Sequence, residues 1–300
     1  MLEYVKEYLK INDVEYKVNK KIKEFSPILI GGEAEIVILP KNKHDFINAV
    51  AFLENVGCRY KIVGNMSNIL PCDERYNGVI VKTDNLSEFT VKGNCISALS
   101  GVKLPYLSHV SASAGLSGME GLSGIPGQLG GSVRGNAGAF GREISDLISV
   151  CEVYSVKTGE ILYMKPGELN FSYRDSLFVK ENLVLLSAEM KLFSTEPEKV
   201  RSEMQKVRDK RKSTQPIGEP SLGSIFKRTK DGVSAAKLID ECGMRGFSIG
   251  GAKISEKHAG FIVNSSEATA KDVKALIAAA CEAVESNFSV KLQREIEYLD

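Results

Sequence analysis

The sequence predicts a mixed α and β fold divided into two or three domains. A chain of 300 residues is long for one hydrophobic core. Strand-type apolar patterns alternate with helical patterns up to about residue 195, and a helix-containing second part follows. Between residues 115 and 141 the chain is dense in glycine yet keeps apolar residues, which indicates a backbone packed inside a domain.

The N-terminal half is expected to alternate between strands and helices. Its first residues form an amphipathic helix without the apolar core of a signal peptide. Pro40 closes the first strand, and Gly57 ends the helix that follows. In order, the expected elements are a strand at 33–39, a helix at 44–56, a strand at 60–63, a small-residue loop at 64–68, a strand at 89–99 and a helix at 103–114.

The C-terminal half begins with a β-rich stretch. Lys157-Thr158-Gly159 is a hairpin signal between two strands. Thr269 and Asp272 have capping-box spacing at the start of the last helix, and Gly243 ends the helix before it. The expected elements are strands at 148–156, 160–164 and 183–193, helices at 197–212 and 234–242, a helix from 269, and a strand at 290–299.

Composition excludes several classes of function. Hydrophobic residues make up 43% and charged residues 26% of the chain, and the net charge of +1 argues against a partner recognised by bulk charge, such as nucleic acid. No run of about 18 apolar residues predicts membrane insertion. Six cysteines without C-x-x-C spacing indicate reduced thiols in a cytoplasmic protein, and three dispersed histidines predict no metal site.

The glycine run is the strongest functional signal. Six glycines fall on every third residue from Gly115 to Gly130, and Gly131 follows. Collagen would need a longer, proline-rich repeat. A backbone without Cβ atoms can press against a ligand, although close chain packing is the alternative. Walker A and Rossmann motifs are absent, but the loops 64–68 and 124–138 could hold the two halves of a diphosphate, which favours a nucleotide cofactor.

Several segments together resemble the UDP-N-acetylenolpyruvoylglucosamine reductases (the MurB family), in its compact type II branch. The similarity runs in order from about residue 25 to the C-terminus. It is carried by Ile30-Gly31-Gly32, VGNMSNIL at 63–70, GLSGIPGQLGGSVRGNAGAFG at 121–141, FSYRDSLF at 171–178, QPIGEPSLGSIFKR at 215–228, AAKLIDECGMRGFSIGGAKISEKHAGFIVN at 235–264 and LQREIEYL at 292–299.

The resemblance implies an α+β fold class. It consists of an FAD-binding domain of the vanillyl-alcohol-oxidase/PCMH type, with two α+β subdomains, and a separate α+β substrate-binding domain. The expected boundaries are 1–82 for the first FAD-binding subdomain with its N-terminal helix, 83–196 for the second, and 197–300 for the substrate domain. The C-terminal strand is expected to return to the active site.

The resemblance also implies the reaction. NADPH would reduce a non-covalently bound FAD, which would then reduce the enolpyruvyl group of UDP-N-acetylglucosamine-enolpyruvate in peptidoglycan precursor synthesis. The glycine loops contain no histidine or cysteine that could attach a flavin covalently. The implied protein is a cytoplasmic NADPH-dependent flavin oxidoreductase, UDP-N-acetylmuramate dehydrogenase, whose partners are the two small molecules.

Three residues match the catalytic positions of the family. Arg174 would stabilise the negative charge that develops on the substrate, because a planar guanidinium suits a carboxylate; an ion pair with Asp175 is the structural alternative. Ser224 would donate a proton to C2, with Ser221 as the nearest rival. Glu295 would orient the carboxylate or enol, whereas Glu297 is its rival two residues later.

The binding residues follow from the same motifs. The expected FAD contacts are Gly64, Asn65, Met66, Ser67, Asn68, Gly124, Ile125, Gly127, Gly130, Gly131, Ser132, Asn136 and Gly138. The expected substrate contacts are Tyr173, Lys227, Arg228 and His258, and the basic stretch 208–212 could neutralise a diphosphate. Met66 stands where the family usually has glycine, and Arg228-Thr229 replaces an Asn-Pro common in relatives.

Two other functions stay open at this point. One is a flavin oxidase on the same FAD fold, which reactivity of the reduced protein with oxygen would reveal. The other is a non-catalytic flavin- or UDP-sugar-binding homologue, which the occupied catalytic positions disfavour.

Overall fold

The computed structural model describes residues 1–300, and its contacts divide the chain into two units. Unit 1 comprises Met1–Val18, Ile36–Gly64 and Gly78–Lys210. Unit 2 comprises Asn19–Glu35, Asn65–Asn77 and Arg211–Asp300. Two N-terminal segments thus belong to the same unit as the C-terminal part of the chain. The predicted boundaries at 82 and 196 stay predictions.

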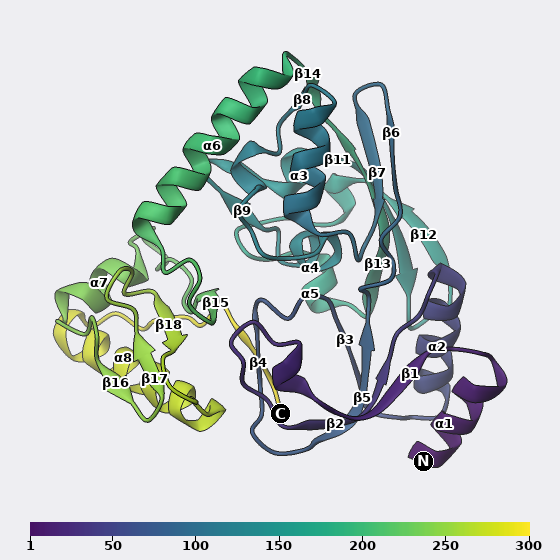
Figure 1. Ribbon diagram of the computed structural model, residues 1–300, viewed down its shortest axis with the longest axis horizontal. Helices are drawn as coiled ribbons and strands as arrows, with labels where there is room; N and C mark the ends of the chain where they lie inside the picture. The colour runs from purple at the N-terminus through teal and green to yellow at the C-terminus, as the bar shows by residue number, and fades with distance from the viewer. The chain divides into compact units, whose positions relative to one another are not determined.

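Unit 1 contains a five-stranded antiparallel sheet of order β12-β11-β13-β7-β6 (Figure 1). Helices α4 and α5 both contact its strand β13, and a cluster of buried apolar residues fills the space between them. The elements are β6 (Phe89–Lys92), β7 (Cys95–Leu99), α3 (Leu104–Ser113), α4 (Leu129–Arg134), β11 (Ile148–Ser155), β12 (Ile161–Met164), α5 (Leu177–Lys180) and β13 (Leu183–Lys191).

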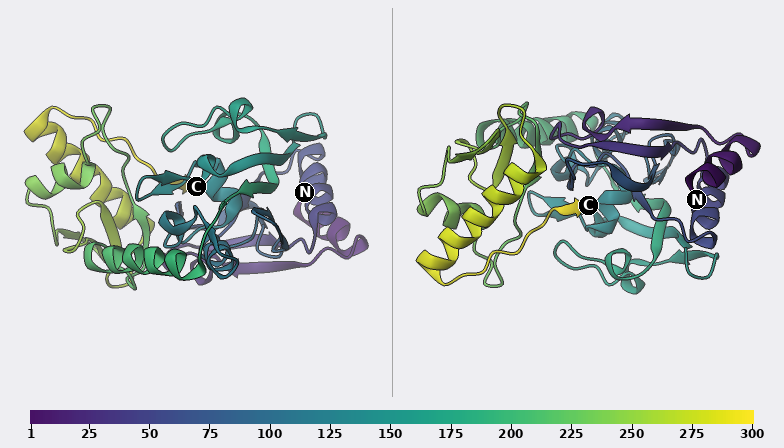
Figure 2. Two further views of the ribbon diagram at one scale, coloured as in Figure 1. Left: turned by 90° about the horizontal axis from the view of Figure 1, so that it is seen from above. Right: turned by 90° about the horizontal axis from the view of Figure 1, so that it is seen from below.

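A second sheet has the order β1-β2-β5-β3, in which β3 and β5 run parallel. Helices α1 and α2 lie side by side in unit 1 (Figure 2), where the rings of Tyr8 and Phe52 stack with centroids 3.7 Å apart. The apolar faces of both helices enter one core cluster. The elements are α1 (Leu2–Ile11), β1 (Tyr16–Lys21), β2 (Glu33–Ile38), α2 (Lys43–Asn55), β3 (Tyr60–Val63) and β5 (Tyr76–Lys82).

Short elements complete unit 1. Strand β8 (Leu116–Ser117) pairs with β14 (Phe193–Ser194), and β9 (Gly138–Ala139) pairs with β10 (Arg142–Glu143). Helix α6 (Pro197–Thr214) packs Val200 and Met204 around Ala112 of α3. The 3-10 turns of the chain are η1 (Ile22–Glu24), η2 (Glu120–Leu122), η3 (Ile144–Asp146) and η4 (Pro166–Glu168).

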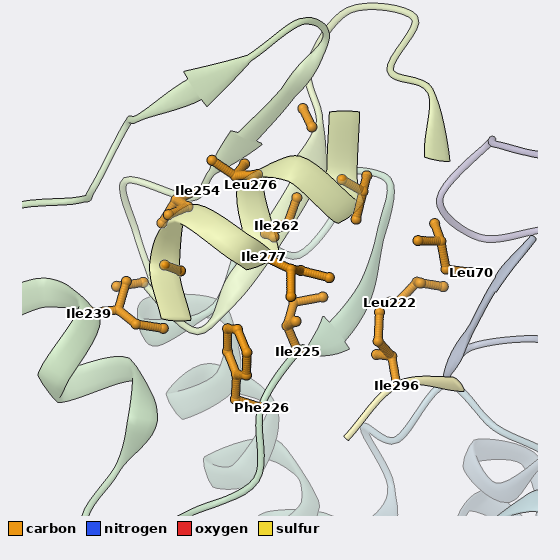
Figure 3. Packing of buried hydrophobic residues seen from close by; sticks show 14 of the residues in the cluster. Leu70, Leu222, Ile225, Phe226, Ile239, Ile254, Ile262, Leu276, Ile277 and Ile296 are labelled. Carbon is orange, nitrogen blue, oxygen red and sulfur yellow. The ribbon is translucent and has the colours of Figure 1, made fainter. Parts of the chain in front are cut away.

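Unit 2 is built around a four-stranded sheet of order β15-β18-β17-β16. Helix α8 contacts β16, β17 and α7, and its apolar face supplies Leu276 and Ile277 to the core shown in Figure 3. The elements are β15 (Ser221–Ser224), α7 (Ala235–Glu241), β16 (Ser248–Ile249), β17 (Ala252–Ile254), β18 (Phe261–Asn264) and α8 (Ala270–Phe288), with β4 (Ile69–Pro71) and β19 (Glu297–Leu299) pairing in parallel beside them.

Local signals confirm most of the expected elements. Thr269 Oγ1 accepts a hydrogen bond from the Asp272 N–H, and the Asp272 carboxylate accepts one from the Thr269 N–H, so the predicted capping box is present. Gly57 and Gly243 take φ values of +63° and +71° just after α2 and α7, the left-handed conformation that favours glycine.

Two predicted strands were wrong in extent. The strand expected at 89–99 is the hairpin β6–β7, because Gly93 (φ +57°) and Asn94 form a two-residue turn between Lys92 and Cys95. The strand expected at 290–299 is reduced to β19, preceded by one bridge between Phe226 and Arg294. Charged and polar residues dominate 291–295, and they lack the alternating apolar pattern that would hold a longer strand.

All six cysteines are free thiols, and three of them are buried. No helix has the length and apolar content needed to cross a membrane.

Candidate active site

The two predicted cofactor loops meet within unit 1 at Gly64 and Gln128. A Cβ atom on Gly64 would lie 2.4 Å from Gln128 Oε1, so a larger residue cannot occupy this position unless the amide moves. Gln128 is 3% exposed; its Oε1 accepts from Thr83 Oγ1 at 2.7 Å, and its Nε2 donates to Asp84 Oδ1 at 2.8 Å. The end of β3 is therefore packed directly against the start of α4.

The glycine pair in α4 has two different environments. A Cβ on Gly130 would lie 3.0 Å from Ser100 Cβ, so close packing explains this glycine. Gly131 has no atom within 4 Å of a built Cβ and no positive φ, although glycine in a helix costs about 1 kcal/mol relative to alanine. Neither packing nor backbone conformation requires glycine at 131. The open space in front of it fits a ligand that approaches the backbone, as a bound flavin dinucleotide would.

The rest of the second loop is fixed by its own packing. The Gly127 carbonyl oxygen accepts from the Leu104 N–H at 2.9 Å, Ile125 packs against the unit 1 core, and Ser132 is 4% exposed. Gly124 lies beside Ile125 at the end of the turn that carries η2. These residues can offer mainly main-chain groups to a cofactor.

The first loop continues into unit 2 with Asn65, Met66, Ser67 and Asn68. Met66 takes φ +53°, in the left-handed region that favours glycine, and the residue is 3% exposed. The methionine thus keeps the backbone of a glycine loop while its side chain is buried.

Asn136 holds a turn together inside unit 1. Its side chain is 0% exposed, and Nδ2 donates to Glu143 Oε2 at 2.8 Å and to the Ser172 carbonyl oxygen at 3.1 Å. Its Oδ1 accepts from the Ser145 N–H at 3.3 Å. The sequence predicts that this side chain contacts FAD. In the structure, both amide protons of Asn136 are donated to groups of the protein itself.

Arg174 occupies a strained position next to this network. The Ser172 and Asp175 main chains exchange two hydrogen bonds, so Tyr173 and Arg174 form a tight turn in which Arg174 has φ +53°. That conformation costs a non-glycine residue roughly 1–2 kcal/mol. The guanidinium donates to the carbonyl oxygens of Gly138, at 2.9 Å, and Asn136, at 3.5 Å. The arginine is therefore held against the end of the glycine run despite the strain.

Asp175, the alternative partner of Arg174, also has other contacts. The Asp175 carboxylate contacts Lys180 Nζ at 2.6 Å and accepts from the Ser176 N–H. Tyr173, 43% exposed, lies under the guanidinium with its ring centre 5.1 Å from Arg174 Cζ. The geometry thus places carbonyl oxygens and an aromatic ring around the arginine.

Unit 2 brings the predicted proton donor and the predicted carboxylate together. Ser224 ends β15, and its hydroxyl donates to the Phe226 carbonyl oxygen at 3.1 Å. The Glu295 N–H donates to the carbonyl oxygen of Ile225, the residue after Ser224, at 2.8 Å. Lys227 N–H donates in turn to the Gln293 carbonyl oxygen at 2.8 Å. Residues 224–227 and 293–295 therefore run side by side, although the printed sequence separates them by about 70 positions.

The rivals of this pair are placed differently. Ser221 pairs with Val263 of β18 at the far end of β15, and Glu297 pairs with Ile69 in the β19–β4 ladder. Neither residue is part of the bridge that joins 224–227 to 293–295.

His258 belongs to the interior of unit 2. Its Nδ1 accepts from the Gly260 N–H at 3.2 Å, and its ring meets Phe261 edge-on with centroids 4.8 Å apart. Burial lowers the pKa of the imidazole below its usual value, and the nearby charge of Arg245 lowers it further. The Gly260 carbonyl oxygen accepts from the Ile225 N–H, which ties this histidine to the Ser224 segment. Arg228 is exposed one residue after Lys227.

Sequence reasoning missed Gln128, Glu143 and the side-chain role of Asn68. Gln128 and Glu120 are the long polar residues between the glycines from Gly115 to Gly131, and that isolation was an available signal. Glu143 bonds Asn136, seven residues earlier, and Asn68 bonds the Glu295 main chain more than 200 residues away, which no local pattern reveals.

Comparison with known proteins defines the class. Residues 34–165 match the model of an FAD-binding domain, and residues 215–299 match the C-terminal domain of UDP-N-acetylenolpyruvoylglucosamine reductase. The chain is thus a flavoprotein with a reductase-type second domain. Its confirmed fold class is α+β with an FAD-binding domain, and FAD is the confirmed cofactor.

The relatives define the family. The chain is 38% identical over 295 residues to the UDP-N-acetylenolpyruvoylglucosamine reductase of Caldicellulosiruptor bescii, covering 97% of this chain and 93% of that protein. The reductase of Caldanaerobacter subterraneus is 37% identical over 99% of this chain and 97% of its own. The chain belongs to the UDP-N-acetylenolpyruvoylglucosamine reductase family, as its motifs predicted.

A solved structure extends the similarity to three dimensions. The crystal structure of the reductase from Thermus caldophilus superposes with a TM-score of 0.80 at 32% identity, covering 95% of this chain and 98% of that one. The likeness therefore includes both the glycine loops and the C-terminal part that carries Ser224 and Glu295.

Proposed function

We propose that this chain reduces the enolpyruvyl group of UDP-N-acetylglucosamine-enolpyruvate in the cytoplasm, with NADPH as the electron source, giving UDP-N-acetylmuramate. The observation that carries the proposal is the hydrogen bond from the Glu295 N–H to the Ile225 carbonyl oxygen, by which the main chain of Glu295 lies beside the Ser224 segment. Bound FAD would supply the hydride chemistry, from NADPH to C3 of the enolpyruvyl group. The residues of this chain then supply charge, orientation and a proton.

Arg174 is proposed to stabilise the negative charge that hydride arrival places on C2 and on the adjoining carboxylate. Its charge is permanent and its donors are planar, so two parallel hydrogen bonds to a carboxylate are possible. A preorganised donor of this kind contributes roughly 3–4 kcal/mol to a transition state. Strain in the φ angle of Arg174 is tolerated where function requires the residue, which supports this role.

Ser224 is proposed to give its hydroxyl proton to C2, which completes reduction of the double bond. In the resting structure this proton is held by the Phe226 carbonyl oxygen at 3.1 Å, so the hydroxyl is oriented before substrate binds. Serine is a weak acid and needs a strongly basic carbanion as acceptor, with Lys227 nearby in sequence to help polarise it. Glu295 is proposed to orient the substrate carboxylate or enol.

The substrate nucleotide is proposed to contact Tyr173, Lys227, Arg228 and His258. Arg228 offers an exposed cation for a diphosphate, in place of the polar side chain common in relatives. Burial keeps His258 neutral near pH 7, so it would act through a hydrogen bond and not through charge.

Separate measurement of the two half-reactions tests the proposal. Purified protein should be yellow, should bleach with NADPH under anaerobic conditions, and should recolour with the enolpyruvyl sugar. Ser224→Ala should bleach normally and recolour at least about 100-fold more slowly, as expected for a lost general acid. Ser221→Ala is the matched control and should recolour at the normal rate. A preparation that cannot be loaded with FAD, or a Ser224→Ala variant within threefold of the wild-type rate, would contradict the proposal.

A further inference from the structure

Asn68 connects the first cofactor loop to the strand that carries Glu295. Its side-chain Nδ2 donates to the Glu295 carbonyl oxygen at 3.1 Å, and its own carbonyl oxygen accepts from the Glu297 N–H at 2.9 Å. The two bonds lie on either side of Ile296, so Asn68 is hydrogen-bonded to two consecutive peptide groups of the chain. All three residues belong to unit 2.

The Glu295 main chain is thereby held at both of its polar groups. Its N–H is bonded to Ile225 and its carbonyl oxygen to Asn68. The next residue, Ile296, is 2% exposed and lies beside Leu70 and Leu222 in the core (Figure 3). With the backbone bonded on both sides and the following side chain buried, the position of the Glu295 Cα is strongly restricted.

The residues that flank Glu295 have contacts of their own. Arg294, on one side of Glu295, stacks its guanidinium 3.4 Å from the ring centre of Tyr298. On the other side, ladder pairing between β19 and β4 starts only at Glu297 and Ile69. Between these anchors, the Asn68 side chain donates to the Glu295 carbonyl oxygen.

We propose that Asn68 is a positioning residue that acts through Glu295: its amide sets where the carboxylate meets the substrate. The inference rests on the proposed function, since it needs Glu295 to act in the second half-reaction. The flavin contact predicted for Asn68 uses the backbone N–H, so the side-chain amide has a separate task. Loss of that amide leaves the main-chain bond to Glu297 in place and releases only the carbonyl of Glu295.

The first test measures the two half-reactions in the FAD-loaded protein. Reduction of Asn68→Ala by NADPH should slow far less than its reoxidation, because Glu295 takes no part in the NADPH step. Reoxidation by the enolpyruvyl sugar should slow by about 10- to 100-fold, the range expected when a reacting group is misplaced by about 1 Å. Asn68→Asp, which has the same shape but cannot donate to a carbonyl oxygen, should behave in the same way. NADPH reduction slowed as much as reoxidation, or loss of FAD, would overturn the inference.

A double-mutant cycle supplies the decisive readout. If Asn68 acts through Glu295, then Asn68→Ala should slow reoxidation by less than twofold in a Glu295→Gln background, whereas independent effects would multiply. Asn264→Ala is the matched control: its side-chain amide bonds two main-chain groups of unit 2, donating to Ile28 and accepting from Ala268, each at 2.9 Å. Its effect should be the same in both backgrounds.

The outcomes separate the two proposals. A Glu295→Gln variant that reoxidises at the wild-type rate contradicts the proposed role of Glu295. A slow Glu295→Gln variant combined with multiplicative effects of Asn68→Ala overturns the positioning role alone. In the supporting outcome, the pH profile of reoxidation also shifts in Asn68→Ala and not in Asn264→Ala, because only the first variant moves the carboxylate.

Discussion

Gly64 and Gln128 fit together so closely that a Cβ on the glycine would lie 2.4 Å from the amide oxygen of the glutamine. The two residues come from different loops, 64 positions apart in the sequence. The contact packs the loop that begins at Gly64 against the loop that contains Gln128 through the buried Gln128 amide. It explains how two short glycine segments can lie next to one dinucleotide.

Gly64→Ala is expected to destabilise the protein by about 1–3 kcal/mol. The new methyl group must displace Gln128 Oε1 from its bond to Thr83 Oγ1, which leaves a buried polar group without its partner. Urea unfolding of the flavin-free protein measures the loss. In a Gln128→Ala background, where the displaced amide is gone, the cost of Gly64→Ala should fall by more than half. An equal cost in both backgrounds would contradict the packing explanation.

Gly131→Ala is expected to separate folding from flavin binding. A methyl group here meets no protein atom, and alanine favours a helix over glycine by about 1 kcal/mol, so the flavin-free protein should be slightly more stable. FAD affinity, measured by fluorescence titration, should fall at least tenfold because the methyl group fills the space that a ligand would use. Gly167→Ala is the control, because its methyl group meets open space and Gly167 has no positive φ; it should leave FAD affinity unchanged. Gly57 is unsuitable as a control because its φ of +63° would strain an alanine. Unchanged FAD affinity in Gly131→Ala would place the cofactor elsewhere.

Arg174→Gly and Arg174→Ala are expected to be equally inactive but unequally stable. Both lack the guanidinium that the proposed reaction needs. The backbone at 174 has φ +53°, which glycine adopts without steric cost, so Arg174→Gly should be more stable than Arg174→Ala by about 1 kcal/mol. Thermal unfolding compares the two proteins, and reoxidation by substrate measures activity. Equal stability would show that the turn relaxes when the arginine is removed.

The sequence was informative where chemistry is local. The capping box at Thr269 and the helix-ending glycines at 57 and 243 depend on neighbouring residues, and each was predicted correctly. The loops expected at 124–138 and around Ser224 instead contain helix α4 and strand β15. The Gly93-Asn94 turn was just as local and was overlooked because apolar residues on both sides suggested one long strand.

The site itself could not be assembled from local patterns. The bond between Glu295 and Ile225 joins segments about 70 residues apart, and the bond between Asn68 and Glu295 spans more than 200. Nothing in LQREIEYL shows that its residues 292–296 leave the strand ladder to lie beside β15. Similarly, the burial of Asn136 depends on Glu143 and Ser172 closing around it. The family resemblance predicted roles for Asn68, Asn136 and Glu295, and the tertiary contacts show how the fold holds these residues in position.

The last prediction concerns His258 and the pH dependence of stability. Burial depresses the pKa of this imidazole in the folded protein below its value of 6.5 in an unfolded chain. Below pH 6.5 the unfolded chain therefore binds more protons at this histidine than the folded protein does. The free energy of unfolding decreases as the pH falls, because the buried ring is stable only in its neutral form. Stability should decrease from pH 7.5 to 5.5 partly for this reason.

His258→Gln tests this origin, because glutamine can still accept from the Gly260 N–H but does not titrate. The variant should be less stable than the wild type at pH 7.5, since the edge-on contact with Phe261 is lost, and its stability should depend less steeply on pH over this interval. Urea unfolding at several pH values gives both slopes. Parallel slopes for the two proteins would assign the acid sensitivity to other groups and would leave His258 accessible to protons in the folded state.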